Sequence, residues 1–245
     1  MAYIKKVYKF RDAIEVEEYH TGRYGAPGIE RQKKRKRTPE QVKAINQYNK
    51  EKRCRHKLRT HFHDGDYLIT CTYKKDERPE DMEQCKKDIS KFMKQVKKEY
   101  AKAGIECKWI RNIEVGEKGA WHFHLVINRI PDTDLIVRKA WTHGKVIFNM
   151  LYENFGDFAS LAGYMTKTPE TCEKYGEHLK ECSYSTSRNL PTPEAKKTVC
   201  NRWKTWKHER KKKGWYVDKN TYYEGINPVT GYPFRRYTFL RSRRD

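Results

Sequence analysis

The chain is poor in the residues that fill protein cores. Leu, Ile, Val and Phe number about 43 among the 245 residues, and the mean hydropathy is −1.08. Together with a net charge of +22, this composition would favour disorder if it were uniform. It is not uniform, because the core-forming residues gather between Tyr67 and Tyr164. We therefore expect a folded middle with basic flanks.

Long apolar runs and paired cysteines are also missing. No run approaches the roughly 18 apolar residues that a membrane span requires, and the first residues, MAYIKKVYKFRD, lack the apolar stretch of a signal peptide. The seven cysteines include no C-x-x-C pair, which favours reduced thiols over disulfides or a zinc knuckle. We expect a cytoplasmic protein with no membrane partner.

Positive charge and aromatic side chains are abundant instead. Lys and Arg number 54 against 32 Asp and Glu, and 17 Tyr, 6 Trp and 9 Phe are interleaved with them. Such an excess of charge could serve RNA, DNA or an acidic membrane surface. The aromatic content favours nucleic acid, and single strands above all, since unpaired bases expose faces on which aromatic rings can stack.

The charge is densest between residues 31 and 59, which contain 13 Lys or Arg and two Glu. Thr38-Pro39-Glu40-Gln41 has the pattern of a helix N-cap, so the sequence predicts a helix from there to about Leu58. The segment is interpreted as an arm that contacts phosphates. Its alternative is a solvated helix with no partner. The residues expected to bind DNA are Lys33, Lys34, Arg35, Lys36, Arg37, Arg53 and Arg55.

The middle of the chain alternates strands and helices. Strands are predicted at 67–73, 107–116, 120–128 and 145–151, with a further one at 182–187, and helices at 78–103 and from Asn154 to about Thr168. This order indicates an α+β fold, in which helices pack on an antiparallel sheet. No internal repeat is visible.

Two His-Phe-His triplets occur, at 61–63 and 122–124. The first precedes a polar turn, and we interpret its histidines as surface residues. The second follows the loop Glu117-Lys118-Gly119, whose length pairs Glu114 with His122 across a hairpin. His124 lies on the same face, so one carboxylate and two imidazoles converge, a donor set that suits a catalytic divalent ion.

Other interpretations of this hairpin remain open. A different register would turn Glu114 away and make Glu117 the substitute ligand. The two histidines could also be structural residues on the sheet face.

Tyr164 and Lys167 are spaced i, i+3 on the late helix, so they project from one side. The alternative is a lysine that snorkels beside a half-buried tyrosine. The combination with a metal-binding hairpin and a basic chain favours a functional pair.

Three ordered motifs carry a resemblance to a known family. The strings YLITCTY, GAWHFHLVIN and the Tyr-Met-Thr-Lys at 164–167 resemble those of HUH endonucleases, the rolling-circle replication initiators of plasmids, phages and other mobile elements. The resemblance runs from about Tyr67 to Pro191. It is similar in detail to bacterial plasmid and phage initiators, including Trp141-x-x-Gly144 and the Ser-Arg-Asn-Leu-Pro at 187–191.

The resemblance implies a fold, an activity and roles for residues. It implies a ferredoxin- or RRM-like palm at 64–191, with a basic, partly helical arm at 1–63 and a basic aromatic extension at 192–245. His122, His124 and Glu114 would hold Mg²⁺ or Mn²⁺, Tyr164 would be the nucleophile, and Lys167 would assist it as a phosphate or tyrosine partner. The enzyme would nick and rejoin single-stranded DNA through a 5′-phosphotyrosine, at a replication origin that we expect to be a hairpin.

The sequence departs from some members of this family. Thr168 stands four residues after Tyr164, so the two-tyrosine form is absent. No G-x-x-x-x-G-K-[ST] is present, so a host helicase and polymerase are expected as partners. Two other functions remain open, an HUH transposase or mobilisation relaxase, and a non-catalytic protein that binds single-stranded nucleic acid.

Overall fold

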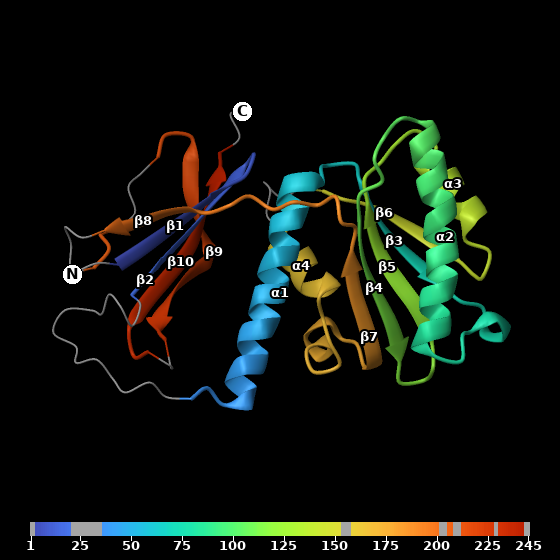
Figure 1. Cartoon of the computed structure of the whole chain (residues 1–245), viewed down its shortest axis with the longest axis horizontal. Coiled ribbons are helices and arrows are strands. Elements are labelled where there is room, and N and C mark those ends of the chain that lie inside the picture. Colours follow the sequence, from blue (N-terminus) through green and yellow to red (C-terminus); the bar gives the residue numbers. More distant parts are fainter. Residues whose placement is uncertain are drawn as a thin grey trace. The chain divides into compact units, whose positions relative to one another are not determined.

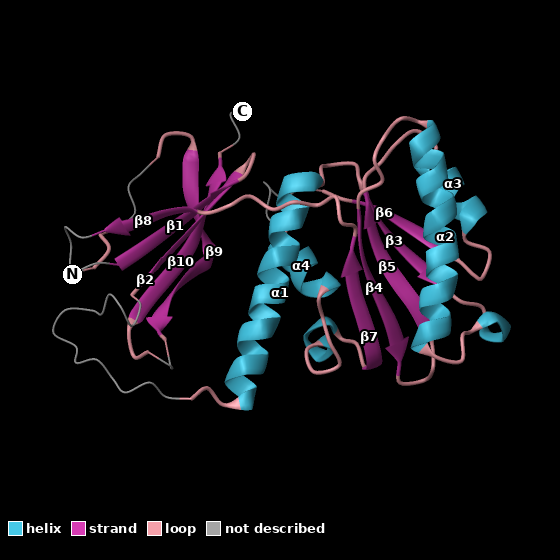
Figure 2. Cartoon of the chain, in the orientation of Figure 1, coloured by secondary structure: helices cyan, strands magenta, loops and turns pink. Residues whose placement is uncertain are grey.

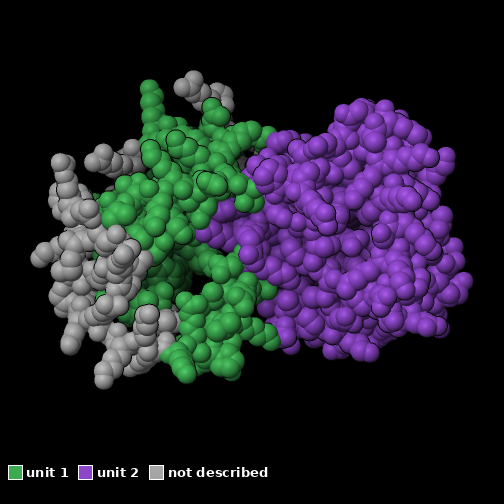
Figure 3. Space-filling view, in the orientation of Figure 1, with its two compact units in different colours: residues 1–49, 154–157, 192–245 green, residues 50–153, 158–191 purple. Residues whose placement is uncertain are grey.

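The computed structural model describes residues 3–20, 36–152, 158–200, 205–207, 212–227 and 230–242. It divides into two compact units (Figure 3). Unit 2 comprises residues 50–153 and 158–191, and unit 1 comprises residues 1–49, 154–157 and 192–245. Each unit contains one five-stranded sheet (Figure 2). Among the described residues, no helix is both long and apolar enough to cross a membrane.

The sheet of unit 2 is antiparallel throughout, with the strand order β6-β3-β5-β4-β7 (Figure 1). The α+β class predicted from the sequence is confirmed. Its strands are β3 (Tyr67–Thr72), β4 (Trp109–Gly116), β5 (Trp121–Ile127), β6 (Val146–Met150) and β7 (Leu179–Thr186), and its helices are α2 (Met82–Lys102), α3 (Thr133–Ala140) and α4 (Ala159–Met165). Short 3₁₀ turns lie at η1 (Lys75–Glu77) and η2 (Cys172–Tyr175).

The two faces of this sheet pack against different helices. Helix α2 begins at its N-cap Asp81, whose side chain accepts a hydrogen bond from the amide of Gln84. It buries Ile89, Phe92 and Val96 in one core cluster with alternate residues of the strands. The other face carries Ile110 and Val126, which pack in a second cluster with α4 and the end of α1 (Pro39–His61). This second face also carries the candidate site.

Helix α1 begins as the sequence predicts. The Thr38 hydroxyl accepts a hydrogen bond from the amide of Gln41, and the Gln41 side chain accepts one from the amide of Thr38, so the capping box is formed. The helix runs three residues beyond the predicted end, to His61. All seven cysteines are free thiols, as expected.

Helix α3 is missing from the sequence predictions, since the residues after Pro131 indicate only a polar stretch. Its short apolar stripe buries Val137 against α2. Asn154 and Phe155, expected to open the late helix, lie outside the described residues, and the described helix α4 begins at Ala159.

Unit 1 contains a second antiparallel sheet with the order β8-β1-β2-β10-β9. Its strands are β1 (Tyr3–Lys9), β2 (Ala13–Tyr19), β8 (Lys196–Cys200), β9 (Trp215–Ile226) and β10 (Pro233–Arg241). Strands from both ends of the chain therefore pair, with β10 beside β2. This sheet is missing from the sequence predictions, because the composition of these segments indicates basic flanks.

Candidate metal and tyrosine site

The β4–β5 hairpin brings Glu114 and His122 together. Gly119 adopts the left-handed conformation at φ 68° and closes the three-residue loop with a hydrogen bond from its amide to the Gly116 carbonyl. Glu114 then lies directly opposite His122, as the loop length predicts. Glu117 is exposed on the loop and takes no part in the cluster. The structure thus selects Glu114 over Glu117.

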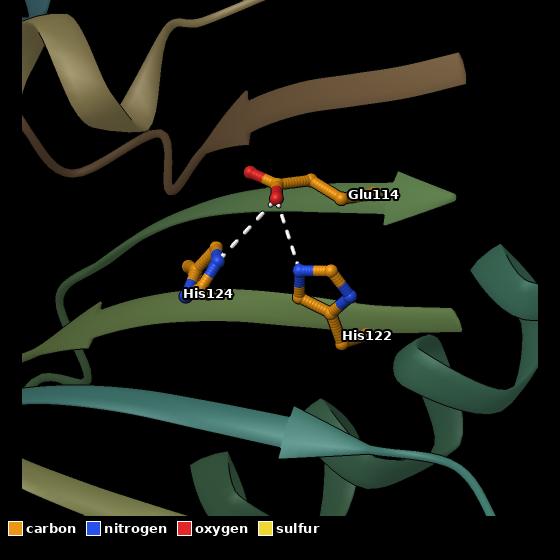
Figure 4. Close-up of side chains that lie close together, drawn as sticks. All are labelled: Glu114, His122 and His124. Atoms are coloured by element: carbon orange, nitrogen blue, oxygen red, sulfur yellow. Dashed lines mark hydrogen bonds and ion pairs between the residues drawn. The ribbon is translucent and has the colours of Figure 1, made fainter. Parts of the chain in front are cut away.

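Both imidazoles point to one carboxylate oxygen (Figure 4). The Oε2 atom of Glu114 lies 3.0 Å from Nε2 of His122 and 3.4 Å from Nε2 of His124. One ligand atom from each of the three residues lies within 4.8 Å of the others. Glu114 is fully buried, whereas the His122 side chain is 24% exposed, so the cluster is reached from the side of His122.

Neighbouring groups fix the remaining atoms of the cluster. The second carboxylate oxygen, Oε1 of Glu114, accepts a hydrogen bond of 2.8 Å from the Asn112 amide. Nδ1 of His124 lies 3.0 Å from the hydroxyl of Thr70 on β3. These contacts leave Oε2 and the two Nε2 atoms facing one another, and such supporting hydrogen bonds orient the ligands of metal ions in proteins.

The protonation states suit cation binding. Burial alone would raise the pKa of Glu114, but hydrogen bonds from His122 and His124 and the charge of Lys167 outweigh burial and hold that pKa far below its usual range. Burial lowers the pKa of His124, against the opposing effect of Glu114. The cluster therefore offers an ionised carboxylate and neutral imidazole nitrogen, the forms that bind divalent metals.

Tyr164 lies directly beside this cluster. Its hydroxyl is 2.8 Å from Nε2 of His124 and donates a hydrogen bond of 3.2 Å to Oε1 of Glu177. Burial, followed by the charges of Glu177 and Glu114, raises the pKa of the phenol above its ordinary value of 10.0. The hydroxyl therefore keeps its proton at neutral pH.

Lys167 is fully buried among these groups. Its Nζ lies 2.9 Å from Oε1 of Glu114 and 2.8 Å from Oε2 of Glu177. It also lies 3.3 Å from the centre of the Tyr164 ring, a cation–π contact. The residue follows the end of α4 and is held there by a hydrogen bond from its amide to the Tyr164 carbonyl. The alternative of a snorkelling lysine is wrong, because the side chain has no exposed surface.

Other expected residues lie away from this cluster. The ring of His61 lies 2.6 Å from the Pro191 carbonyl, and His63 is exposed. Of the residues expected to bind DNA, Lys36, Arg37 and Arg53 are exposed and Arg55 is half-buried. Lys33, Lys34 and Arg35 lie outside the described residues.

Glu177 is the member of the site that sequence reasoning missed. It lies 13 residues beyond Tyr164, after the η2 turn, where no helical or strand periodicity assigns it a face. The only local signal is Gly176, which adopts φ 69° and ends that turn.

Comparison with protein families gives one match within this region. The family model of the replication-associated protein ORF2 matches residues 66–169. That range includes Glu114, His122, His124 and Tyr164, and it ends before Glu177. No curated protein and no solved structure matches the chain.

Proposed function

We propose that the chain is a metal-dependent enzyme that nicks and rejoins single-stranded DNA, and that it initiates rolling-circle replication of a mobile element. One observation carries the proposal. The hydroxyl of Tyr164 lies 2.8 Å from a nitrogen of the Glu114-His122-His124 cluster. The match of residues 66–169 to a replication-associated family supports the same function.

The cluster fits a divalent cation of the Mg²⁺ or Mn²⁺ kind. One ionised carboxylate oxygen and two imidazole nitrogens converge from adjacent strands, and this mixed O/N set leaves further positions for substrate oxygens. When bound, such an ion would polarise the scissile phosphate and stabilise the charge that develops on its oxygens.

Tyr164 would supply the nucleophile. Its oxygen would attack phosphorus, forming the Oη–P bond while the bond from phosphorus to the 3′-oxygen breaks. The product would be a 5′-phosphotyrosine and a free 3′-hydroxyl that primes synthesis. A later attack by a 3′-hydroxyl would reverse the step and rejoin strands, because the phosphodiester energy is kept in the tyrosyl link.

Lys167 would hold the nucleophile and balance charge. Its ammonium lies against the Tyr164 ring and pairs with Glu114 and Glu177. With that cation in place, both carboxylates can stay ionised close to the tyrosine. This fixed geometry favours attack, because a positioned nucleophile avoids much of the entropy cost of the reaction.

The proposal is tested with labelled single-stranded DNA from the origin of the element that encodes the chain. Wild type, Tyr164→Phe and the control Tyr152→Phe are incubated with Mn²⁺, Mg²⁺ or EDTA and run on a denaturing gel. Tyr152 is the matched control because its side chain is 73% exposed. We expect cleavage and a covalent protein–DNA band from wild type and Tyr152→Phe in either metal, and neither product from Tyr164→Phe or in EDTA.

Two outcomes would contradict the proposal. Cleavage that persists in Tyr164→Phe but is lost in Tyr152→Phe would move the nucleophile to Tyr152. Tight binding of DNA without cleavage, on every origin segment and with either metal, would favour a non-catalytic binding protein and make His122 and His124 structural.

A further inference from the structure

We propose that Glu177 is the catalytic residue that accepts the phenolic proton of Tyr164 during strand cleavage and returns it during rejoining. This inference rests on the proposed function and adds a residue to it. The family match does not extend to Glu177, since it ends at residue 169.

The turn before β7 presents Glu177 to the tyrosine. Gly176 adopts φ 69°, and its amide donates to the Glu173 carbonyl, which closes the η2 turn. The next amide, that of Glu177, donates to the Cys172 carbonyl. The His178 carbonyl accepts a hydrogen bond from the amide of Glu117, which ties this turn to the β4–β5 hairpin. Glu177 is therefore held by backbone contacts on both sides.

The two oxygens of Glu177 have different partners. Oε1 accepts the hydrogen bond of 3.2 Å from Tyr164, and Oε2 pairs with Nζ of Lys167 at 2.8 Å. Because Lys167 is fully buried and also paired with Glu114, it anchors Oε2 and leaves Oε1 for the tyrosine. A carboxylate within hydrogen-bond reach of the reacting hydroxyl satisfies the geometric requirement for a general base.

His124 is the competing acceptor, and ligation removes it. Its Nε2 lies 2.8 Å from the Tyr164 hydroxyl, but the same atom faces Glu114 in the cluster. If Nε2 is a ligand, its lone pair is committed and the ring proton lies on Nδ1, which can donate to the Thr70 hydroxyl. Lys167 is protonated and has no lone pair to offer. Among the described residues that contact the hydroxyl, Glu177 then remains as the acceptor.

The proton can be followed through the step. As the Oη–P bond forms and the bond from phosphorus to the 3′-oxygen breaks, the phenolic proton moves to Oε1 of Glu177. The leaving 3′-oxygen takes a proton from water. In rejoining, the Oη–P bond breaks and protonated Glu177 returns a proton to Oη. The Glu177 side chain is 28% exposed, so it can exchange its proton with solvent between the two steps.

The first test compares rates of covalent complex formation in a single turnover, with saturating origin DNA and Mn²⁺. The variants are Glu177→Gln, which removes the base with little change in shape, Glu177→Asp, and the control Glu173→Gln at an exposed position of the same turn. We expect Glu177→Gln to be slower by about 100-fold or more, Glu177→Asp to be intermediate, and Glu173→Gln to match wild type. A Glu177→Gln rate within about threefold of wild type would overturn the inference.

A pH series separates proton acceptance from a structural role. The titratable groups that face Glu177 are Tyr164, Lys167 and, beyond Lys167, Glu114. They are present in both proteins, so the ratio of the wild-type rate to the Glu177→Gln rate isolates Glu177. That ratio should fall about tenfold for each pH unit between about pH 6 and pH 9, because hydroxide replaces the missing base. A ratio that stays constant with pH would show that Glu177 acts only through structure.

A substrate with sulfur in place of the bridging 3′-oxygen locates the proton transfer. A thiolate leaves without a proton, so a defect of Glu177→Gln on the leaving-group side would disappear, and that result would overturn our assignment. A defect that persists supports the assignment to Tyr164. Failure of the proposed function is recognised separately, since Tyr164→Phe would then cleave as wild type does.

Discussion

Lys167 connects two carboxylates that would otherwise face each other in a poorly solvated site. Its substitution by Met keeps the length of the side chain and removes the charge. Breaking a buried ion network in this way typically costs about 3–5 kcal/mol, because the remaining charges lose their partner. We expect a loss of that order in the free energy of unfolding measured in urea, against less than about 0.5 kcal/mol for the exposed control Lys174→Met. Equal stability of the two variants would show that the network adds nothing to the fold.

Glu114 makes stability depend on pH in a defined direction. Its pKa in the folded chain lies below the ordinary value of 4.5, so its stabilising contribution is complete above that value and is lost as the pH falls below it. We expect the free energy of unfolding, measured in EDTA, to decrease more steeply below about pH 4.5 in wild type than in Glu114→Gln. Glu117→Gln, on the exposed loop of the same hairpin, should keep the wild-type slope. Parallel curves for all three proteins would contradict the assigned ion pairs.

The sequence predicts those site residues whose placement depends on local spacing. Loop length alone sets Glu114 opposite His122, and strand alternation places His124 on the same face. It does not predict that Lys167 is buried, because burial depends on where the following turn places Glu177. That contact joins two segments with no shared periodicity, and only the folded chain brings them together.

Gly144 explains why the segment after Trp141 tolerates no side chain. A Cβ at this position would lie 1.9 Å from the Thr72 carbonyl oxygen and 3.0 Å from Cα of Tyr73, both backbone atoms that cannot swing aside. The Trp141 indole donates to the same Thr72 carbonyl at 3.0 Å. Gly144→Ala should therefore displace β3 or the Trp141 loop and destabilise the chain by about 1–3 kcal/mol or more. The control Gly116→Ala, whose Cβ would meet atoms only at 3.7 Å or beyond, should cost far less in the same melt.

Elements of unit 2 follow from the sequence because their signals are local. Helix α2 shows helical spacing of apolar residues, an N-cap and a terminal glycine, and β3 is a short run of β-branched and aromatic residues. The strands of unit 1 were missed for a different reason. Strand β2 alternates Ile14 and Val16 with glutamates, but its partner β10 lies at the other end of the chain, and no local turn links the two. The basic composition of these segments obscured a pattern that is present.

At the scale of the whole molecule, the site is confined to one unit. Glu114, His122, His124, Tyr164, Lys167 and Glu177 all belong to unit 2. Unit 1 contributes its own sheet and the beginning of α1, which follows the basic cluster. We infer a division of labour in which unit 2 carries the chemistry and the basic arm adds affinity for phosphates.

The net charge of +22 makes DNA affinity a test of that division. Each phosphate contact to a single strand contributes about 0.7 to the slope of log K against log salt concentration, since binding releases condensed counterions. Replacing Lys33, Lys34, Arg35, Lys36 and Arg37 by Gln should therefore flatten the slope by up to about 3.5, while metal-dependent cleavage of saturating DNA persists. The matched control removes the same charge from exposed positions of α2, on the sheet face opposite the site, at Lys86, Lys87, Lys91, Lys94 and Lys98. Fluorescence anisotropy with labelled single-stranded DNA at a series of salt concentrations measures both slopes. An arm variant that keeps the wild-type slope, or one no flatter than the α2 control, would show that the arm is solvated and that the DNA lies elsewhere.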